Sequence, residues 1–192
     1  MTLNRSDSDA GTTRRRAWPV IMVAVAFFGL LATLPLVLPV LPASQAGHVS
    51  AIDPVGADTI GWPGFVSTVA TAWHQLPARQ RASAAIFTGN YGEAGAITEL
   101  GRADRLPQAV SGQNNEWYWG PGNARATTIL AVVQPGFPQL VTQLRGDFAH
   151  VRIVAIISNS AHVNQEEGGH VYICTGPVRP WGQLWPSFRY NS

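Results

Sequence analysis

The most extended apolar stretch of this chain is an uncharged run over 17–42, which directly follows Arg14, Arg15 and Arg16. A helix rises about 1.5 Å per residue, so about 20 such residues cross a bilayer core of roughly 30 Å. Short segments rich in arginine stay on the cytoplasmic side of a membrane. The pattern predicts a cytoplasmic tail over 1–16, a single transmembrane helix over 17–42 in the plasma membrane, and an extracytoplasmic C-terminal domain.

A secretory signal peptide is the alternative interpretation, because Ser44, Gln45 and Ala46 offer small residues around a possible cleavage point. The apolar core of a signal peptide is about 7–15 residues, which is much shorter than this run. We therefore favour a retained anchor with membrane lipid as its partner. Both interpretations place the rest of the chain outside the cytoplasm.

Behind the apolar run, 43–61 has the small residues, proline and glycines of a linker. Helical spacing of apolar residues then begins at Trp62 and ends before Pro77. Further elements are expected as strands over 84–88, 128–133, 151–157 and 171–174, and as helices over 91–100 and 140–148. Strands that alternate with helices predict one α/β domain over 62–192, with three layers and a mainly parallel sheet.

Charge is unevenly distributed along the chain. The segment 1–16 holds four of the 13 basic residues and two of the 11 acidic ones, which leaves nine of each sign in the rest. Affinity for nucleic acid depends largely on clustered cations that neutralise phosphates. The neutral balance after residue 16 therefore argues against nucleic acid as a partner.

Two residue counts narrow the chemistry further. The sequence contains no lysine, which excludes a P-loop lysine, Schiff-base catalysis and a lysine general base. Cys174 is the single cysteine and cannot form an internal disulfide. We interpret Cys174 as a small buried apolar residue of a strand rather than as a nucleophile.

A glycine-rich turn at 88–97 joins a predicted strand to a predicted helix. Asn90 with Glu93 three residues later fits a capping box, in which the two residues close the helix N-terminus reciprocally. The turn also follows the carboxyl end of a strand, where open α/β sheets bind ligands, so Asn90, Tyr91 and Glu93 are candidate substrate-binding residues. Both interpretations stay open. Nucleotide binding is disfavoured, because Glu93 would occupy the position that a phosphate needs.

A second polar segment over 111–121 places Asn114, Asn115 and Glu116 beside three aromatic residues that end in Trp119. Aromatic rings cover the apolar face of a sugar while amides bind its hydroxyls, so Asn114 and Trp119 are candidate sugar contacts. Such amphipathic rings also suit a membrane interface or the edge of a core. The chain has no G-x-S-x-G motif, which leaves a serine hydrolase without support.

A third polar segment, 162–170, contains two histidines and two glutamates. The histidines lack the i, i+4 spacing of a helical metal site, so we interpret the segment as a polar turn between strands. We expect no catalytic residue, no metal and no cofactor in this chain.

Several motifs together resemble the C-terminal part of bacterial family 39 glycosyltransferases, which are similar to protein mannosyltransferases. The motifs are the apolar helix, 61–63, 90–95, 111–114, 119–121 and 180–186. The resemblance implies a multi-helix membrane enzyme that transfers a sugar from a polyprenyl-phosphate donor, with its catalytic acid in an exterior loop of the helical bundle. No residue of this chain matches that loop, so the resemblance implies no catalytic residue here.

We therefore expect an exterior cap or accessory domain of such a glycosyltransferase, in a truncated or split form that is inactive alone. Its partners would be a multi-helix glycosyltransferase subunit and a glycan acceptor. The alternative is a membrane-anchored glycan-binding or scaffold protein of the cell envelope that acts by itself. Independent hydrolase activity ranks last.

Overall fold

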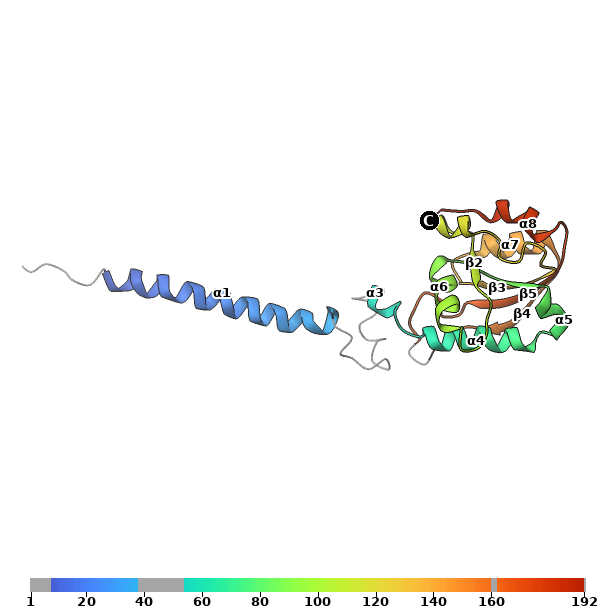
Figure 1. Cartoon of the computed structure of the whole chain (residues 1–192). Helices are drawn as coiled ribbons and strands as arrows, with labels where there is room; N and C mark the ends of the chain where they lie inside the picture. Colours follow the sequence, from blue (N-terminus) through green and yellow to red (C-terminus); the bar gives the residue numbers. More distant parts are fainter. Residues whose placement is uncertain (1–7, 38–53, 160–161, 192) are drawn as a thin grey trace, which may run out of the picture.

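The computed structural model describes residues 8–37, 54–159 and 162–191 of the chain (Figure 1). Helix α1 spans Ser8–Val37 and thus starts ahead of the three arginines rather than behind them. Its large apolar side chains between Trp18 and Leu31 are exposed. In the part of the chain that the structure describes, we find no helix with both the length and the hydropathy needed to cross a membrane.

The remaining elements alternate in type along the chain. The helices are α3 (Pro54–Ala57), α4 (Trp62–Gln75), α5 (Ala78–Ala82), α6 (Tyr91–Leu100), η2 (Asn114–Trp119), α7 (Pro138–Asp147), α8 (Trp181–Leu184) and η3 (Trp185–Phe188). The strands are β1 (Ala84–Thr88), β2 (Ala109–Ser111), β3 (Thr128–Val133), β4 (Phe148–Ile156) and β5 (His170–Pro177). The expected α/β fold class is confirmed.

The five strands form one sheet in the order β2-β1-β3-β5-β4. β1 pairs in parallel with both β2 and β3, whereas β5 pairs antiparallel with β3 and with β4. Four strands therefore run in one direction and only β5 is reversed, so the sheet is mostly parallel as predicted. The reversal follows from the connection between β4 and β5, because its described residues form no helix that would carry the chain back to the starting edge.

Alternate residues of the central strands enter two separate cores. On one face Ile86 and Leu130 pack with α4 and α6, and on the other face Phe87 and Ile129 pack with α7 and the C-terminal helices. Figure 1 shows α4 below the sheet and α7 and α8 above it. A strand with helices on both faces must be apolar on both sides, and every residue of β1 and β3 is buried.

Two features depart from the sequence prediction. The segment expected as a linker over 43–61 contains the short helix α3, and β2 is a three-residue strand that the apolar pattern did not indicate. A short strand carries too few residues for a periodic signal. β2 nevertheless matters for the site, because it extends the sheet on one side of β1 while β3 extends it on the other.

This order creates a topological switch point between β1 and β3. From β1 the chain passes through α6 to β2, which lies on one side of β1 in the sheet. β3 lies on the opposite side of β1, and the helix that follows it, α7, packs on the other face of the sheet from α6. In open α/β sheets, ligands bind in the crevice at the carboxyl ends of the strands that flank such a point. The polar residues that follow β1, β2 and β3 therefore define the candidate site.

Candidate functional site

Asn90 and Glu93 form the predicted capping box at the N-terminus of α6. The Oδ1 of Asn90 accepts from the backbone amide of Glu93 at 2.8 Å, and Glu93 Oε2 accepts from the backbone amide of Asn90 at 3.0 Å. Two amide groups that a helix leaves without intrahelical partners are thereby satisfied. The structural role that the sequence predicts for this pair is confirmed.

The side-chain amide of Asn90 has a second role that capping does not require. Its Nδ2 donates to Glu166 Oε1 at 2.8 Å and to Gln134 Oε1 at 2.6 Å. Gln134 directly follows β3, and Glu166 lies in the loop before β5. Asn90 therefore connects the chain segments that flank the switch point.

The loop that carries Glu166 is tied to the segment between α3 and α4. Asn164 Nδ2 donates to the carbonyl oxygen of Ile60 at 2.8 Å, and Asp58 Oδ1 accepts from the backbone amide of Gln165 at 3.0 Å. These contacts to the chain on either side of Glu166 hold its carboxylate, which is 2% exposed, against the end of β1. The segment expected to be a polar turn is thus a turn that supplies a buried acid.

Glu93 and Glu166 form a buried carboxyl pair. Glu93 is 0% exposed, and burial, followed by the hydrogen bond and the charge of Glu166, raises the pKa of Glu93 well above its usual value. Glu93 Oε1 is buried with no hydrogen-bond partner when both groups are ionised. Two carboxylates in contact cannot both be charged at low cost, so the isolated pair shares one proton.

Tyr190 closes this cluster from the C-terminal side. Its hydroxyl is buried, and burial is the main reason why the pKa of the Tyr190 hydroxyl is raised. Ser111 opposes this shift, and the nearby charges of Glu93 and Glu166 add to it. The backbone of Tyr190 is fixed by Gly112, whose carbonyl accepts from the Tyr190 amide at 3.1 Å. A Cβ at Gly112 would lie only 1.8 Å from the carbonyl oxygen of Phe188, so only glycine fits there.

Exposed aromatic rings lie on the two helices that begin beside the cluster, α6 and η2. The backbone amide of Tyr91 donates to Gln113 Oε1 at 3.0 Å, which joins the start of α6 to the residue ahead of η2. Tyr91 is 59% exposed and Trp119, at the end of η2, is 71% exposed. The guanidinium of Arg189 lies 5.0 Å from the ring centre of Tyr118, so this ring already has a partner. Tyr91 and Trp119 remain available to a ligand.

The five residues predicted from sequence occupy different positions around this cluster. Asn90 and Glu93 belong to its buried part, Tyr91 and Trp119 are exposed, and Asn114 is half-buried in a left-handed conformation with φ of 52°. Glu93 has no solvent-accessible surface and therefore acts on a ligand only through its neighbours. The sequence analysis missed Gln134, Glu166 and Tyr190.

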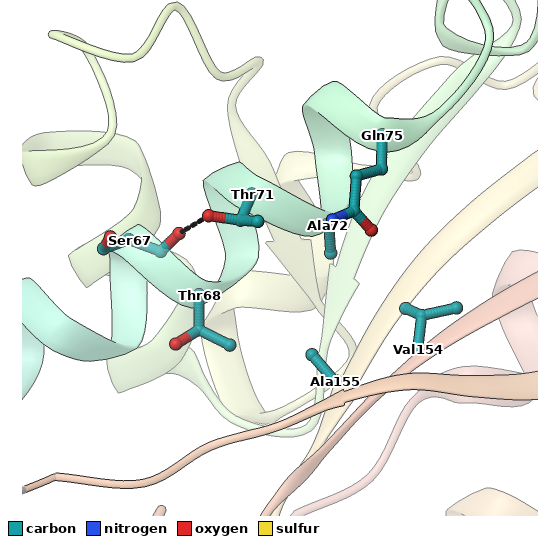
Figure 2. Close-up of a pocket in the computed structure, with 7 residues that line it drawn as sticks. All are labelled: Ser67, Thr68, Thr71, Ala72, Gln75, Val154 and Ala155. Atoms are coloured by element: carbon teal, nitrogen blue, oxygen red, sulfur yellow. Dashed lines mark hydrogen bonds between the residues drawn. The ribbon is translucent and has the colours of Figure 1, made fainter.

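Two other depressions have less chemistry to offer. A cavity of about 210 Å³ lies between α4 and β4. Figure 2 shows the residues that line it, which include Ser67, Thr68 and Thr71 of α4 and Val154 and Ala155 of β4. The hydroxyls of Thr68 and Thr71 donate to the carbonyl oxygens of Gly64 and Ser67, at 3.0 and 2.9 Å, so their protons are already used within the helix.

A hollow of about 340 Å³ between α7 and the C-terminal segment includes Tyr190 in its wall. The Tyr190 ring lies 5.7 Å from that of Phe137 on this side, while its hydroxyl is near the carboxyl pair. Tyr190 thus belongs both to the wall of this hollow and to the surroundings of the carboxyl pair.

Cys174 is buried, and burial raises the pKa of its thiol to about 12, as expected for a small apolar core residue rather than a nucleophile. Among the described residues, no group of three or more histidine, cysteine, aspartate or glutamate side chains is placed to hold a metal ion. His162 instead contacts Glu167, with 3.1 Å between Nδ1 and Oε1.

No protein-family model matches this sequence, and neither the curated proteins nor the solved structures include a match to it. Functional inference therefore depends on the cluster itself.

Proposed function

We propose that this protein is a membrane-anchored, extracytoplasmic sugar-recognition domain that works as the cap or accessory part of a polyprenyl-phosphate-sugar glycosyltransferase. The observation that carries sugar recognition is the position of a polar network at the switch point, where two helices with exposed aromatic rings begin. Asn90, Gln134 and Glu166 form the network, and Tyr91 and Trp119 supply the rings.

The composition of the network suits a hydroxyl-rich ligand better than an anion. Within the described residues, no arginine or histidine side chain bonds to Glu93 or Glu166, and the α6 N-terminus is already occupied by the Glu93 carboxyl group. A phosphate would therefore meet negative charge where it needs donors. Sugar hydroxyls both donate and accept, so they match a mixed set of amide and carboxyl groups.

Attachment to a membrane is supported by the sequence and by α1. The run over 17–42 is uncharged and follows three arginines, and the apolar side chains of α1 are exposed. An exposed apolar helical surface of this kind is costly in water and stable in lipid. The glycosyltransferase assignment rests on the motif resemblance described above.

A binding experiment tests sugar recognition. The full chain in detergent is titrated with a panel of neutral hexoses and pentoses, free and as short-chain polyprenyl phosphates, and tryptophan fluorescence is recorded. We expect at least one of these compounds to bind, with weaker binding by Trp119→Ala and Tyr91→Ala. Leu100→Ala is the matched control, because Leu100 is an exposed apolar residue at the opposite end of α6.

A glycosyltransferase role makes a separate prediction about partners. If the chain is an accessory domain, a multi-helix membrane protein should co-purify with it from its own membranes under mild detergent. Sugar binding without any such protein would support the stand-alone glycan-binding alternative. Absence of sugar binding across the panel would contradict the proposed function in both forms.

A further inference from the structure

We propose that the cluster of Glu93, Glu166 and Gln134 binds a single hard divalent cation of the calcium and magnesium class. The proposed cation site shares Gln134 and Glu166 with the proposed sugar-recognition network, but cation binding requires no sugar.

The first argument is charge. Glu93 and Glu166 are 0% and 2% exposed, and among the described contacts no basic side chain pairs with either of them. Buried carboxylates are normally paired with a cation or coordinate a metal. A proton shared by the two groups is one solution, and a metal cation is the other.

The second argument is the unpartnered oxygen. Glu93 Oε1 is fully buried and has no hydrogen-bond partner among the described residues, and the side chain of Glu93 contacts that of Glu166. An unsatisfied buried carboxylate oxygen costs more than an unsatisfied neutral group. A cation between Glu93 and Glu166 would satisfy this oxygen and neutralise both charges.

The third argument comes from Gln134. Its side-chain oxygen lies 3.0 and 3.3 Å from the two carboxylate oxygens of Glu166. Rotating the amide would place its nitrogen there, but that nitrogen would then lie 2.6 Å from Asn90 Nδ2, which is also a donor. Asn90 cannot rotate in turn, because its oxygen caps α6. The orientation that Asn90 imposes thus holds the oxygens of Gln134 and Glu166 side by side, with the Asn90 amide donating to both.

Oxygens separated in this way are typical of neighbouring ligands of one cation. Oxygens that share a proton usually lie at about 2.5–2.7 Å, which is shorter than both Gln134 distances. The set contains only oxygen ligands, which suit calcium, magnesium or manganese rather than zinc or copper. The set consists of two carboxylates and one amide oxygen. It is therefore not one of the groups of three or more histidine, cysteine, aspartate or glutamate side chains, none of which is found among the described residues.

The test uses the full chain in detergent, stripped with EDTA and dialysed, without any sugar. Thermal unfolding is followed while CaCl₂, MgCl₂ or MnCl₂ is added up to about 5 mM, with NaCl at matched ionic strength as the control. We expect at least one cation to raise the Tm with saturation, at an apparent Kd at or below about 1 mM, the range of extracellular calcium modules. Isothermal titration calorimetry should give one site per chain.

Glu166→Gln should weaken that affinity more than tenfold, whereas Glu167→Gln should leave it within twofold. Glu167 is the matched control, because its carboxylate instead accepts from the backbone of Asn159 at 2.8 Å. If Glu166→Gln fails to fold, Gln134→Glu is tested in its place. It adds a third carboxylate, so its Tm should depend on the cation more strongly than that of the unmodified chain.

No change in Tm with any of the three cations would overturn the proposal and leave the shared proton as the only neutralising species. An equal response in the unmodified chain, Glu166→Gln and Gln134→Glu would also overturn it, because the cation would then bind elsewhere.

Discussion

Asn90 donates its side-chain amide to the carboxylate of Glu166 across 2.8 Å, although the two residues are 76 positions apart in the chain. The same amide group caps α6 through its oxygen. One side chain therefore holds both the helix after β1 and the loop before β5 at the carboxyl edge of the sheet. Local helix capping and long-range closure of the site depend on the same residue.

The double role of Asn90 predicts different costs for two substitutions. Asn90→Ala removes the cap, which costs about 0.5–2 kcal/mol, and removes the donor of a buried carboxylate, which adds about 1–3 kcal/mol. Asn90→Ser retains a capping oxygen and loses only the donor. We expect Asn90→Ala to lower the free energy of unfolding more than Asn90→Ser by about 1 kcal/mol in urea titrations. Equal losses would show that capping contributes nothing here.

Glu93 offers a second comparison. Glutamine resembles a protonated glutamate, because it donates through Nε2 and accepts through Oε1 at nearly the same positions. In cation-free buffer, Glu93→Gln should therefore keep the free energy of unfolding within about 1 kcal/mol, whereas Glu93→Ala should lose about 1–3 kcal/mol by leaving the Asn90 amide without its acceptor. A large loss in Glu93→Gln would mean that Glu93 is ionised in the cation-free protein.

The raised pKa of Glu93 sets the direction of a pH effect. Its pKa in the folded protein lies above the usual value of 4.5, chiefly because the group is buried and secondly because it contacts Glu166. The folded state then binds the proton more tightly than the unfolded state does. This contribution to stability is fully present below pH 4.5 and is lost as the pH rises through the raised pKa.

In EDTA, the Tm of the unmodified chain relative to that of Glu93→Gln should therefore fall as the pH rises above about 4.5. Glu166 and Tyr190 are the other titratable groups near Glu93, and Tyr190 stays neutral throughout because its pKa is raised. A profile unchanged by Glu93→Gln would contradict the shared proton.

The topology prediction rests on the arginines at 14–16 and the uncharged run behind them. A reporter enzyme that is active only outside the cytoplasm, fused after Ser192, should be active and should sediment with membranes after washing at high salt. Replacing the three arginines by glutamine should lower reporter activity, because the orientation signal is removed. A shortened form released from the membrane would support the signal-peptide alternative.

The sequence predicted those parts of the fold that depend on local pattern. β1 and β3 have the predicted bounds, and the Asn90–Glu93 capping box forms as its spacing indicated. The sequence could not predict that Gln134 and Glu166 meet Asn90. Their contact depends on the strand order, which is set by packing between segments far apart in the chain.

Tyr190 was missed for a related reason. It lies near the end of the chain, outside any periodic segment, and reaches the site only because Gly112 lets the C-terminal backbone approach β2. No sequence pattern singled out Gly112, which in the structure marks a close approach of two backbones.

Hydrogen exchange on the full chain tests the central claim most directly. The compound with the highest affinity in the sugar panel is added at saturation, and exchange of backbone amides is compared with and without it. Sugar recognition at the switch point predicts slower exchange over 88–93 and 111–119, with no change over α7 (Pro138–Asp147), which serves as the internal control. Protection confined to the α4–β4 cavity or to the hollow beside α7, with none over 88–93, would contradict the account.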